Sequence, residues 1–207
     1  MSGEVFGEMN AMNHCSSIKI GRRSAIGAPH PAPMHIVLFG AGHVGHALIQ
    51  LLGNLPCVVQ WVDGRDELFP DETPANVQIE ATDTPDAIVD TAPPGAWFLV
   101  MTHNHALDFS LAERIMRRRD FSYFGMIGSK TKRVKFERRL LARGVELERL
   151  QQMTCPIGVS GIVDKAPAMI AVAVCAELLQ VRGRQATAEA AARSGKQAVF
   201  ERVATNV

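Results

Sequence analysis

Apolar and polar residues follow one another along this chain in blocks that predict alternating strands and helices. Short apolar runs rich in β-branched and aromatic residues are typical of buried parallel strands. Blocks whose apolar residues recur every three or four positions are typical of amphipathic helices. The predicted strands occupy residues 36–39, 57–62, 77–81, 97–101, 123–127 and 154–157. The predicted helices occupy residues 43–54, 85–91, 107–118, 130–143, 146–152 and 166–181. This alternation predicts an α/β fold with a doubly wound, mostly parallel sheet of about six strands and helices on both faces.

The first strand leads into a glycine-rich turn, Gly-Ala-Gly-His-Val-Gly, at residues 40–45. Gly40 permits a tight turn, Gly42 lets a phosphate approach the backbone, and Gly45 lets helix and strand pack closely. Free N–H groups at the start of the next helix favour an anion there. The second strand then ends at Asp63, where an acid commonly holds a pair of ribose hydroxyls. Strand, glycine turn, helix, strand and acid together predict a Rossmann-like, dinucleotide-binding unit.

Two side chains beside this unit are further candidates for ligand contacts. His43 is able to hydrogen-bond a phosphate or a ring edge while neutral near pH 7, and the alternative is a solvent-facing residue at the helix start. Arg65 is able to bind a phosphate, so the pair with Asp63 is compatible with either NAD or NADP. Asp63 is equally able to cap the turn that follows it.

Four polar residues follow the strand at 97–101, where the carboxyl ends of parallel strands place ligand-binding loops. They are His103, Asn104, His105 and Asp108. Two histidines, an amide and an acid suggest a metal site, but no H-E-x-x-H spacing is present, and the segment straddles a strand end and a helix start. We therefore expect polar contacts with a ligand and predict no metal. Capping of the helix by Asn104 or Asp108 is the alternative.

A second candidate anion site follows the strand at 123–127. Gly128 and Ser129 stand at a helix start, and Ser129 or Thr131 would supply the capping hydroxyl. Lys130 and Arg133 are the candidate phosphate ligands. The alternative is a capped helix with a solvated basic face.

A third loop, after the strand at 154–157, contains Gly158, Ser160 and Lys165. The glycine permits close approach of a ligand, and the lysine adds positive charge beside a helix start. No Ser-His-Asp set or pair of carboxylates on one element is apparent along the chain. Hydrolytic chemistry therefore has no specific support, and no catalytic residue is predicted.

Composition limits the function classes. The 207 residues are 47% hydrophobic with a formal net charge of +1, which does not indicate a nucleic-acid-binding protein. Charge is nevertheless segregated: residues 63–90 hold nine acids and one arginine, whereas residues 114–143 hold eleven basic residues and two acids. This polarity indicates an anionic ligand or an acidic partner on one side, unless both segments are solvated helix faces.

Cysteine spacing and hydropathy indicate a cytoplasmic protein with no membrane segment. The four cysteines show no C-x-x-C spacing, which is typical of reduced thiols, and no signal peptide is apparent. Residues 1–33 are predicted to be an irregular tail and proline-rich linker. Residues 34–182 are the predicted cofactor-binding domain, and residues 183–207 an Ala-rich tail able to form a frayed helix.

Several of these segments, in this order, resemble the Rossmann-domain portion of the XdhC/CoxI family, the xanthine dehydrogenase accessory proteins. The resembling segments are residues 39–45, 62–65, 102–108, 127–130 with the basic helix after them, and 155–158 leading into 170–174. Two features depart from the family pattern. Only a short tail with Arg22-Arg23-Ser24 stands where members carry an N-terminal domain with an Arg-Gly-Ser-type motif, and Asp164 replaces a small residue.

The resemblance implies an accessory protein rather than an enzyme. It implies a chaperone that binds molybdenum cofactor (molybdopterin), shields it while its terminal sulfur is installed, and passes it to a molybdenum hydroxylase. The implied partners are apo xanthine dehydrogenase or a related hydroxylase, a cysteine desulfurase and a second copy of the chain. The cofactor would contact the turn at Gly42, residues 128–130 and the polar wall at 103–108. An NAD(P)-dependent oxidoreductase and a nucleotide-sensing module remain the alternatives.

Overall fold

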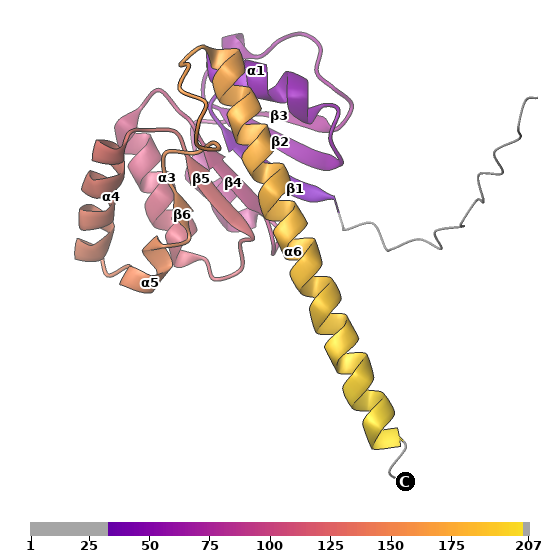
Figure 1. Cartoon of the computed structure of the whole chain (residues 1–207). Coiled ribbons are helices and arrows are strands. Elements are labelled where there is room, and N and C mark those ends of the chain that lie inside the picture. Colours follow the sequence, from indigo (N-terminus) through magenta and orange to yellow (C-terminus); the bar gives the residue numbers. More distant parts are fainter. Residues whose placement is uncertain (1–32, 205–207) are drawn as a thin grey trace, which may run out of the picture. The chain divides into compact units, whose positions relative to one another are not determined.

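Six strands form one parallel sheet in the order β3-β2-β1-β4-β5-β6 (Figure 1). The computed structural model describes residues 33–204, and side chains through residue 192. The strands are β1 (Met34–Phe39), β2 (Cys57–Asp63), β3 (Val77–Ala81), β4 (Trp97–Val100), β5 (Tyr123–Met126) and β6 (Met153–Thr154). The tail predicted at residues 1–33 lies, apart from residue 33, outside the described residues. The predicted doubly wound α/β fold is confirmed.

The helices alternate with the strands as the apolar pattern predicts. They are α1 (His43–Leu52), α2 (Pro85–Thr91), α3 (His105–Arg117), α4 (Lys130–Ala142), α5 (Leu147–Leu150) and α6 (Pro167–Ala204), with a 3-10 turn, η1 (Asp66–Leu68), after β2. None of the helices in the described part of the chain has both the length and the hydropathy that a membrane span requires.

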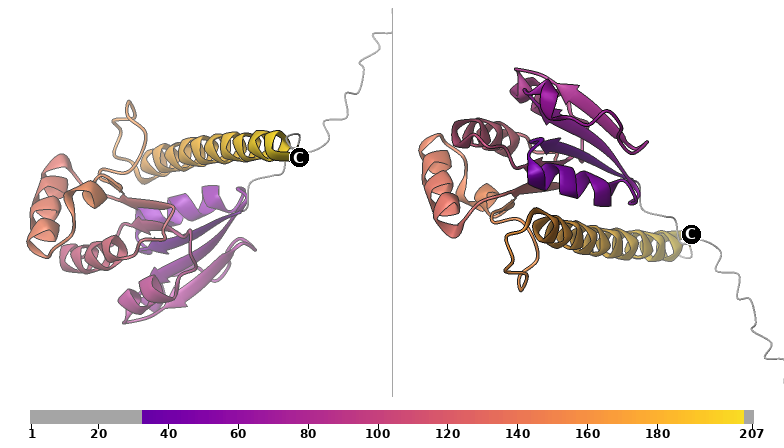
Figure 2. Two further views of the ribbon diagram at one scale, coloured as in Figure 1. Left: turned by 90° about the horizontal axis from the view of Figure 1, so that it is seen from below. Right: turned by 90° about the horizontal axis from the view of Figure 1, so that it is seen from above.

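Each face of the sheet has its own apolar core, because successive side chains of a strand point to opposite faces. In β1, Ile36 and Leu38 pack with residues of α1 and α6, whereas Val37 and Phe39 pack with residues of α2, α3 and α4. Figure 2 shows α1 and α6 together on one side of the sheet. All four of these side chains are 0–1% exposed, so the carboxyl half of β1 is fully buried between the layers.

The order of the strands reverses between β1 and β4, which pair side by side in the centre of the sheet. The chain leaves β1 for α1 on one face and leaves β4 for α3 on the other. Their loops therefore separate at the carboxyl edge of the sheet, which is where open α/β sheets bind ligands. This topology directs attention to the loops after β1, β2 and β4.

Two elements differ in length from the sequence-based expectation. The short strand predicted at 154–157 is Met153–Thr154, and it ends before Pro156, which has no N–H to donate to a ladder. The helix predicted at 166–181 continues through the segment expected as a separate tail, so that α6 is one helix from Pro167 to Ala204. Its continuation is rich in alanine, which has the highest helix propensity.

The packing around α1 makes two glycine substitutions differ sharply. A Cβ atom at Gly45 would lie 2.2 Å from the carbonyl oxygen of Gly40, whereas a Cβ at Gly42 would meet no atom within 4 Å. We expect Gly45→Ala to lower the free energy of unfolding by about 1–3 kcal/mol, because strand and helix must separate. Gly42→Ala should change it by less than about 1 kcal/mol, because it alters only the N-cap position of α1. Urea unfolding followed by circular dichroism measures both, and equal losses would contradict this account of the turn.

Candidate functional site

The glycine turn after β1 is fixed by packing at two of its glycines and open at the third. Gly40 has φ +118°, and a Cβ there would lie 2.5 Å from the carbonyl oxygen of Met101 at the end of β4. Gly45 is held against Gly40 itself. Gly42, by contrast, borders open space at the start of α1. The first backbone N–H groups of a helix have no partner within the helix, so this open helix start favours an anion.

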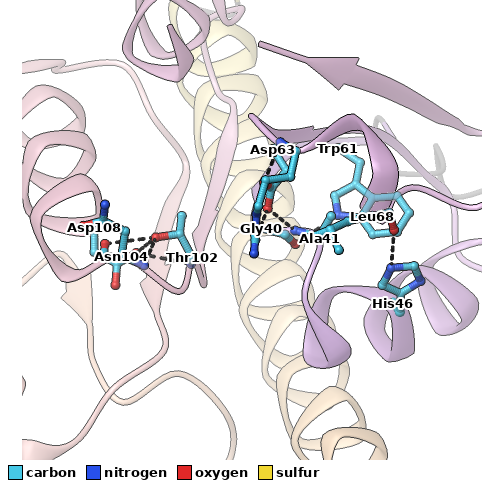
Figure 3. A network of polar contacts seen from close by, with 10 residues as sticks. Gly40, Ala41, His46, Trp61, Asp63, Leu68, Thr102, Asn104 and Asp108 are labelled. Carbon is cyan, nitrogen blue, oxygen red and sulfur yellow. Dashed lines mark hydrogen bonds and ion pairs between the residues drawn. The ribbon is translucent and has the colours of Figure 1, made fainter. Parts of the chain in front are cut away.

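An aromatic group that the sequence analysis did not single out supports the turn from behind. The indole N–H of Trp61 donates to the carbonyl oxygen of Gly40 at 3.0 Å. His46 packs edge-on to Trp61 with ring centroids 4.9 Å apart, and its Nε2 donates to the carbonyl oxygen of Leu68 at 2.7 Å (Figure 3). A tryptophan within an apolar strand was the available signal, because a buried indole N–H requires an acceptor.

The carboxylate of Asp63 is buried, and four N–H groups fill its acceptor positions. Oδ2 accepts from the backbone N–H of Ala41 at 2.7 Å and from Arg65 Nη2 at 2.9 Å. Oδ1 accepts from the backbone N–H of Arg65 at 3.1 Å and from its Nε at 2.9 Å. Burial by itself raises the pKa of Asp63, but these bonds outweigh burial and hold the pKa below its ordinary value.

On the far side of the site, the loop after β4 is organised by its own polar residues. Asn104 caps α3, because its Oδ1 accepts from the backbone N–H groups of Ala106 and Leu107 at 2.9 and 3.2 Å. Asp108 is completely buried, and its Oδ1 accepts from the hydroxyl of Thr102 at 2.7 Å. Figure 3 shows this group facing the glycine turn. Asn104 therefore supplies the cap that the sequence left open between Asn104 and Asp108.

A buried ion pair joins this loop to α4. Lys132 Nζ donates to Asp108 Oδ2 at 2.6 Å and to the carbonyl oxygen of Ile127 at 2.8 Å, and its side chain is 9% exposed. The candidate phosphate ligands lie elsewhere on the helix: Lys130 is exposed, and Arg133 Nε donates to Glu137 at 2.7 Å. Lys130, Lys132 and Arg133 thus have different surroundings, because they point to different sides of α4.

The remaining candidates near α4 serve local packing. Ser129 caps the helix, with its Oγ accepting from the backbone N–H of Lys132 at 3.1 Å. Gly128 packs against the same lysine, since a Cβ there would lie 2.7 Å from Lys132 Cδ and 3.2 Å from Cys155 Sγ. Neither residue needs a ligand to explain its identity.

The loop after β6 is tied to α6. Gly158, with φ +111°, donates its backbone N–H to Glu177, whose other carboxylate oxygen accepts from the hydroxyl of Tyr123 at 2.9 Å. Burial, followed by the charge of Glu177, raises the pKa of Tyr123 well above its ordinary value. Ser160 and Lys165 are exposed on this loop.

Two cavities lie at the carboxyl edge of the sheet and share Arg65, Thr102 and His103 in their walls. The glycine-turn cavity, of about 560 Å³, is further lined by residues of the turn and of α1, with Met101, Ile127 and Pro167. The acidic cavity, of about 380 Å³, is further lined by residues at the ends of β1 and β2 and by residues that follow β3 and β4. Both volumes are in the range of small-molecule sites.

The cavities bring together part of the set that the sequence predicts. The predicted site residues in their walls are Gly40, Gly42, His43, Gly45, Asp63, Arg65, His103 and Asn104. The predicted site residues that line neither cavity are His105, Asp108, Gly128, Ser129, Lys130, Arg133, Gly158, Ser160 and Lys165. The site is therefore concentrated around the loops after β1, β2 and β4.

The two cavities differ in charge. Among the described residues, no carboxylate lines the glycine-turn cavity, which has Arg65 and the histidines His43, His46 and His103 in its wall. The acidic cavity contains Asp83 in addition to the Asp63–Arg65 pair. Within the described part of the chain, no three His, Cys, Asp or Glu side chains are grouped so as to hold a metal ion.

Comparison with known proteins identifies the family. The model of the XdhC Rossmann domain matches residues 36–178, which are more than half of the chain. The chain belongs to the XdhC family. The match begins in β1, ends in α6 and includes all six strands, so the two cavities lie within the XdhC Rossmann domain itself.

One relative and one solved structure match this XdhC Rossmann domain over part of their length. It is 29% identical over 168 residues to the uncharacterized protein YqeB of Escherichia coli K12, in a match covering 78% of this chain and 30% of YqeB. A crystal structure of a xanthine dehydrogenase from Bacillus halodurans has the same fold, with a TM-score of 0.60 and 23% identity over 72% of this chain and 42% of that one. The chain thus spans less than half the length of either protein.

The buried ion pair should contribute much more to stability than the neighbouring surface lysine. In Lys132→Met the Asp108 carboxylate loses its cation while remaining buried, so the free energy of unfolding should fall by about 3–5 kcal/mol. In Lys130→Met no ion pair is lost, and the change should stay within about 0.5 kcal/mol. Urea unfolding at pH 7 tests the pair, and similar values for both variants would argue against a structural role for Lys132.

The Asp63–Arg65 pair should make part of the stability dependent on acidic pH. Because the pKa of Asp63 is lowered on folding, its contribution is present above the unfolded-state pKa and is lost as pH falls through the folded-state pKa. In Arg65→Ala the pKa of Asp63 should rise, since burial then acts with less opposition. The stability difference between wild type and variant should therefore shrink as the solution is acidified. Carboxyl-detected NMR titration measures the pKa directly, and an unchanged value would contradict the assignment.

Proposed function

We propose that this chain is the cofactor-binding part of an accessory protein for xanthine dehydrogenase or a related molybdenum hydroxylase. In this role it holds molybdenum cofactor, protects it during sulfuration and assists its insertion into the client enzyme. Membership of the XdhC family supports the accessory role. The observation that carries cofactor binding is the pair of cavities that adjoin at Arg65, Thr102 and His103.

The residues present suit the parts of this cofactor. Molybdenum cofactor combines a phosphate-bearing chain with a pterin ring and a molybdenum centre. The glycine-turn cavity includes the open start of α1 at Gly42, and no carboxylate lines it among the described residues; an anion favours such surroundings. The acidic cavity combines apolar walls with polar groups, as heterocycle sites do. One ligand with an anionic end and a heterocyclic body would use both cavities.

The surroundings of Asp63 favour this proposal over an NAD-dependent dehydrogenase. A dehydrogenase of this fold uses the acid after β2 to accept hydrogen bonds from two ribose hydroxyls. Here Ala41 and Arg65 already occupy both carboxylate oxygens of Asp63. A ribose would therefore have to displace the arginine, whereas a ligand without this requirement leaves the pair intact.

The proposed partners follow from the proposed role. They are apo xanthine dehydrogenase or a related hydroxylase as client, a cysteine desulfurase as sulfur donor, and a second copy of the chain. The proposed setting is the cytoplasm, where such a transfer between proteins would occur.

Gly42→Val should abolish or strongly weaken cofactor binding while leaving the fold intact. Its side chain would enter the open space beside the helix start, which in the proposal an anion occupies. We expect at least about a tenfold rise in Kd for molybdenum cofactor, equivalent to about 1.4 kcal/mol. Anaerobic titration of purified protein, followed by cofactor absorbance, measures the affinity.

Gly183→Val is the matched control, because a Cβ at Gly183 also meets open space but lies on α6 away from both cavities. It should bind cofactor as the wild type does. Parallel titrations with NADH and NADPH test the alternative function. Binding of a pyridine nucleotide with hydride transfer, and no binding of molybdenum cofactor, would overturn the proposal.

A further inference from the structure

Asp83 is a carboxylate without a partner in the wall of the acidic cavity. It follows β3 in the turn before α2 and is exposed. Its Oδ1 would lie 3.5 Å from a Cβ built on Gly64, which places the carboxylate beside the end of β2. Among the described residues, no group donates a hydrogen bond to it or forms an ion pair with it. Both oxygens are therefore available to a ligand.

Its neighbour Asp63 does not share this property. The charge of Asp63 is balanced by Arg65, and both its oxygens are occupied. Asp83 thus leaves the acidic cavity with one uncompensated negative charge. An anionic group would be repelled there and would favour the glycine-turn cavity, so the two cavities select different ends of one ligand.

The rest of the acidic cavity suits a flat ring. Apolar side chains of Val62, Pro85 and Leu107 contribute to its wall. One carboxylate is too few ligands for Ca²⁺, which takes six to eight oxygen ligands. A neutral heterocycle with adjacent N–H donors on one edge satisfies the carboxylate and the apolar wall together.

We propose that Asp83 accepts two hydrogen bonds from the 2-amino and ring N–H groups of a pterin, and so determines which ring the acidic cavity binds. This inference rests on the proposed cofactor-binding function and assigns its pterin end to one cavity and one residue. An amino group on a heterocycle also occurs in adenine and cytosine, and guanine has the same adjacent pair of donors as a pterin. Two donors side by side match two free oxygens, and the pterin is the occupant argued here because the proposed cofactor contains it.

The test compares 6-hydroxymethylpterin with 6-hydroxymethyllumazine, in which a carbonyl oxygen replaces the 2-amino group. Intrinsic fluorescence of each ring reports binding to the full chain. Wild type should bind the pterin at least about tenfold more tightly than the lumazine. Hydrogen bonds to a charged acceptor are strong, and the lumazine places a carbonyl oxygen, which cannot donate, against the carboxylate. Asp83→Asn should lose this preference by weakening pterin binding.

Asp71→Asn is the matched control, since it makes the same charge change at an exposed acid that lines neither cavity. It should retain the preference of the wild type. Unfolding curves of all three proteins should coincide, because Asp83 makes no contact that the fold requires. Equal affinity of wild type for the two rings, no binding of the pterin, or an unchanged preference in Asp83→Asn would overturn the inference.

Two further arms separate this inference from the proposed function. Binding of GMP, AMP or CMP that depends on Asp83, in preference to pterin, would show a nucleobase as the occupant and overturn the pterin assignment. If wild type and Asp83→Asn bind molybdenum cofactor equally, the inference fails while the proposed function stands. If the pterin preference depends on Asp83 but the cofactor is not bound, the inference holds while the proposed function fails.

Discussion

The carbonyl group of Gly40 is the point at which β1, β2 and α1 meet, and the site depends on this contact. Its oxygen accepts the indole N–H of Trp61 in β2 and leaves no room for a Cβ on Gly45 in α1. Asp63 adds a second tie, through the N–H of Ala41. Because the protein itself fixes the turn from behind, the turn lines the cavity in a set conformation without a ligand to hold it. Such preorganisation lowers the entropy cost of binding.

The wall opposite the turn is held by a different kind of interaction. The buried pair of Asp108 and Lys132 connects the loop after β4 with the first turn of α4, and Thr102 donates to the same carboxylate. A buried ion pair is weak evidence for net stability, since desolvation offsets much of the attraction. Its effect here is to fix position: Thr102 and the adjacent His103, which line both cavities, lie on a loop that α4 holds in place.

The sequence predicted the features that nearby residues determine. It did not predict the contacts between loops that are distant in the sequence. The glycine turn and the alternation of strands and helices can be read from spacing, because each is determined by nearby residues. The buried ion pair of Lys132 could not be predicted, since it depends on which face of α4 meets the carboxylate of Asp108. Asp83 gave no signal beyond its place in an acidic run, because its neighbours in the cavity come from β2 and β4.

The difference in charge between the two cavities determines how a ligand is oriented in them. Asp83 repels the anionic end of a ligand, whereas the helix start at Gly42 attracts it. A ligand that spans both cavities, past Arg65 in their common wall, therefore has one favourable orientation. Arg65 pairs with Asp63 through Nε and Nη2, and in the described part of the chain it forms no ion pair with Asp83. The ion pair that stabilises the turn therefore also preserves the negative charge of the acidic cavity. Loss of Arg65 would leave Asp63 uncompensated beside Asp83 and make the acidic cavity more negative.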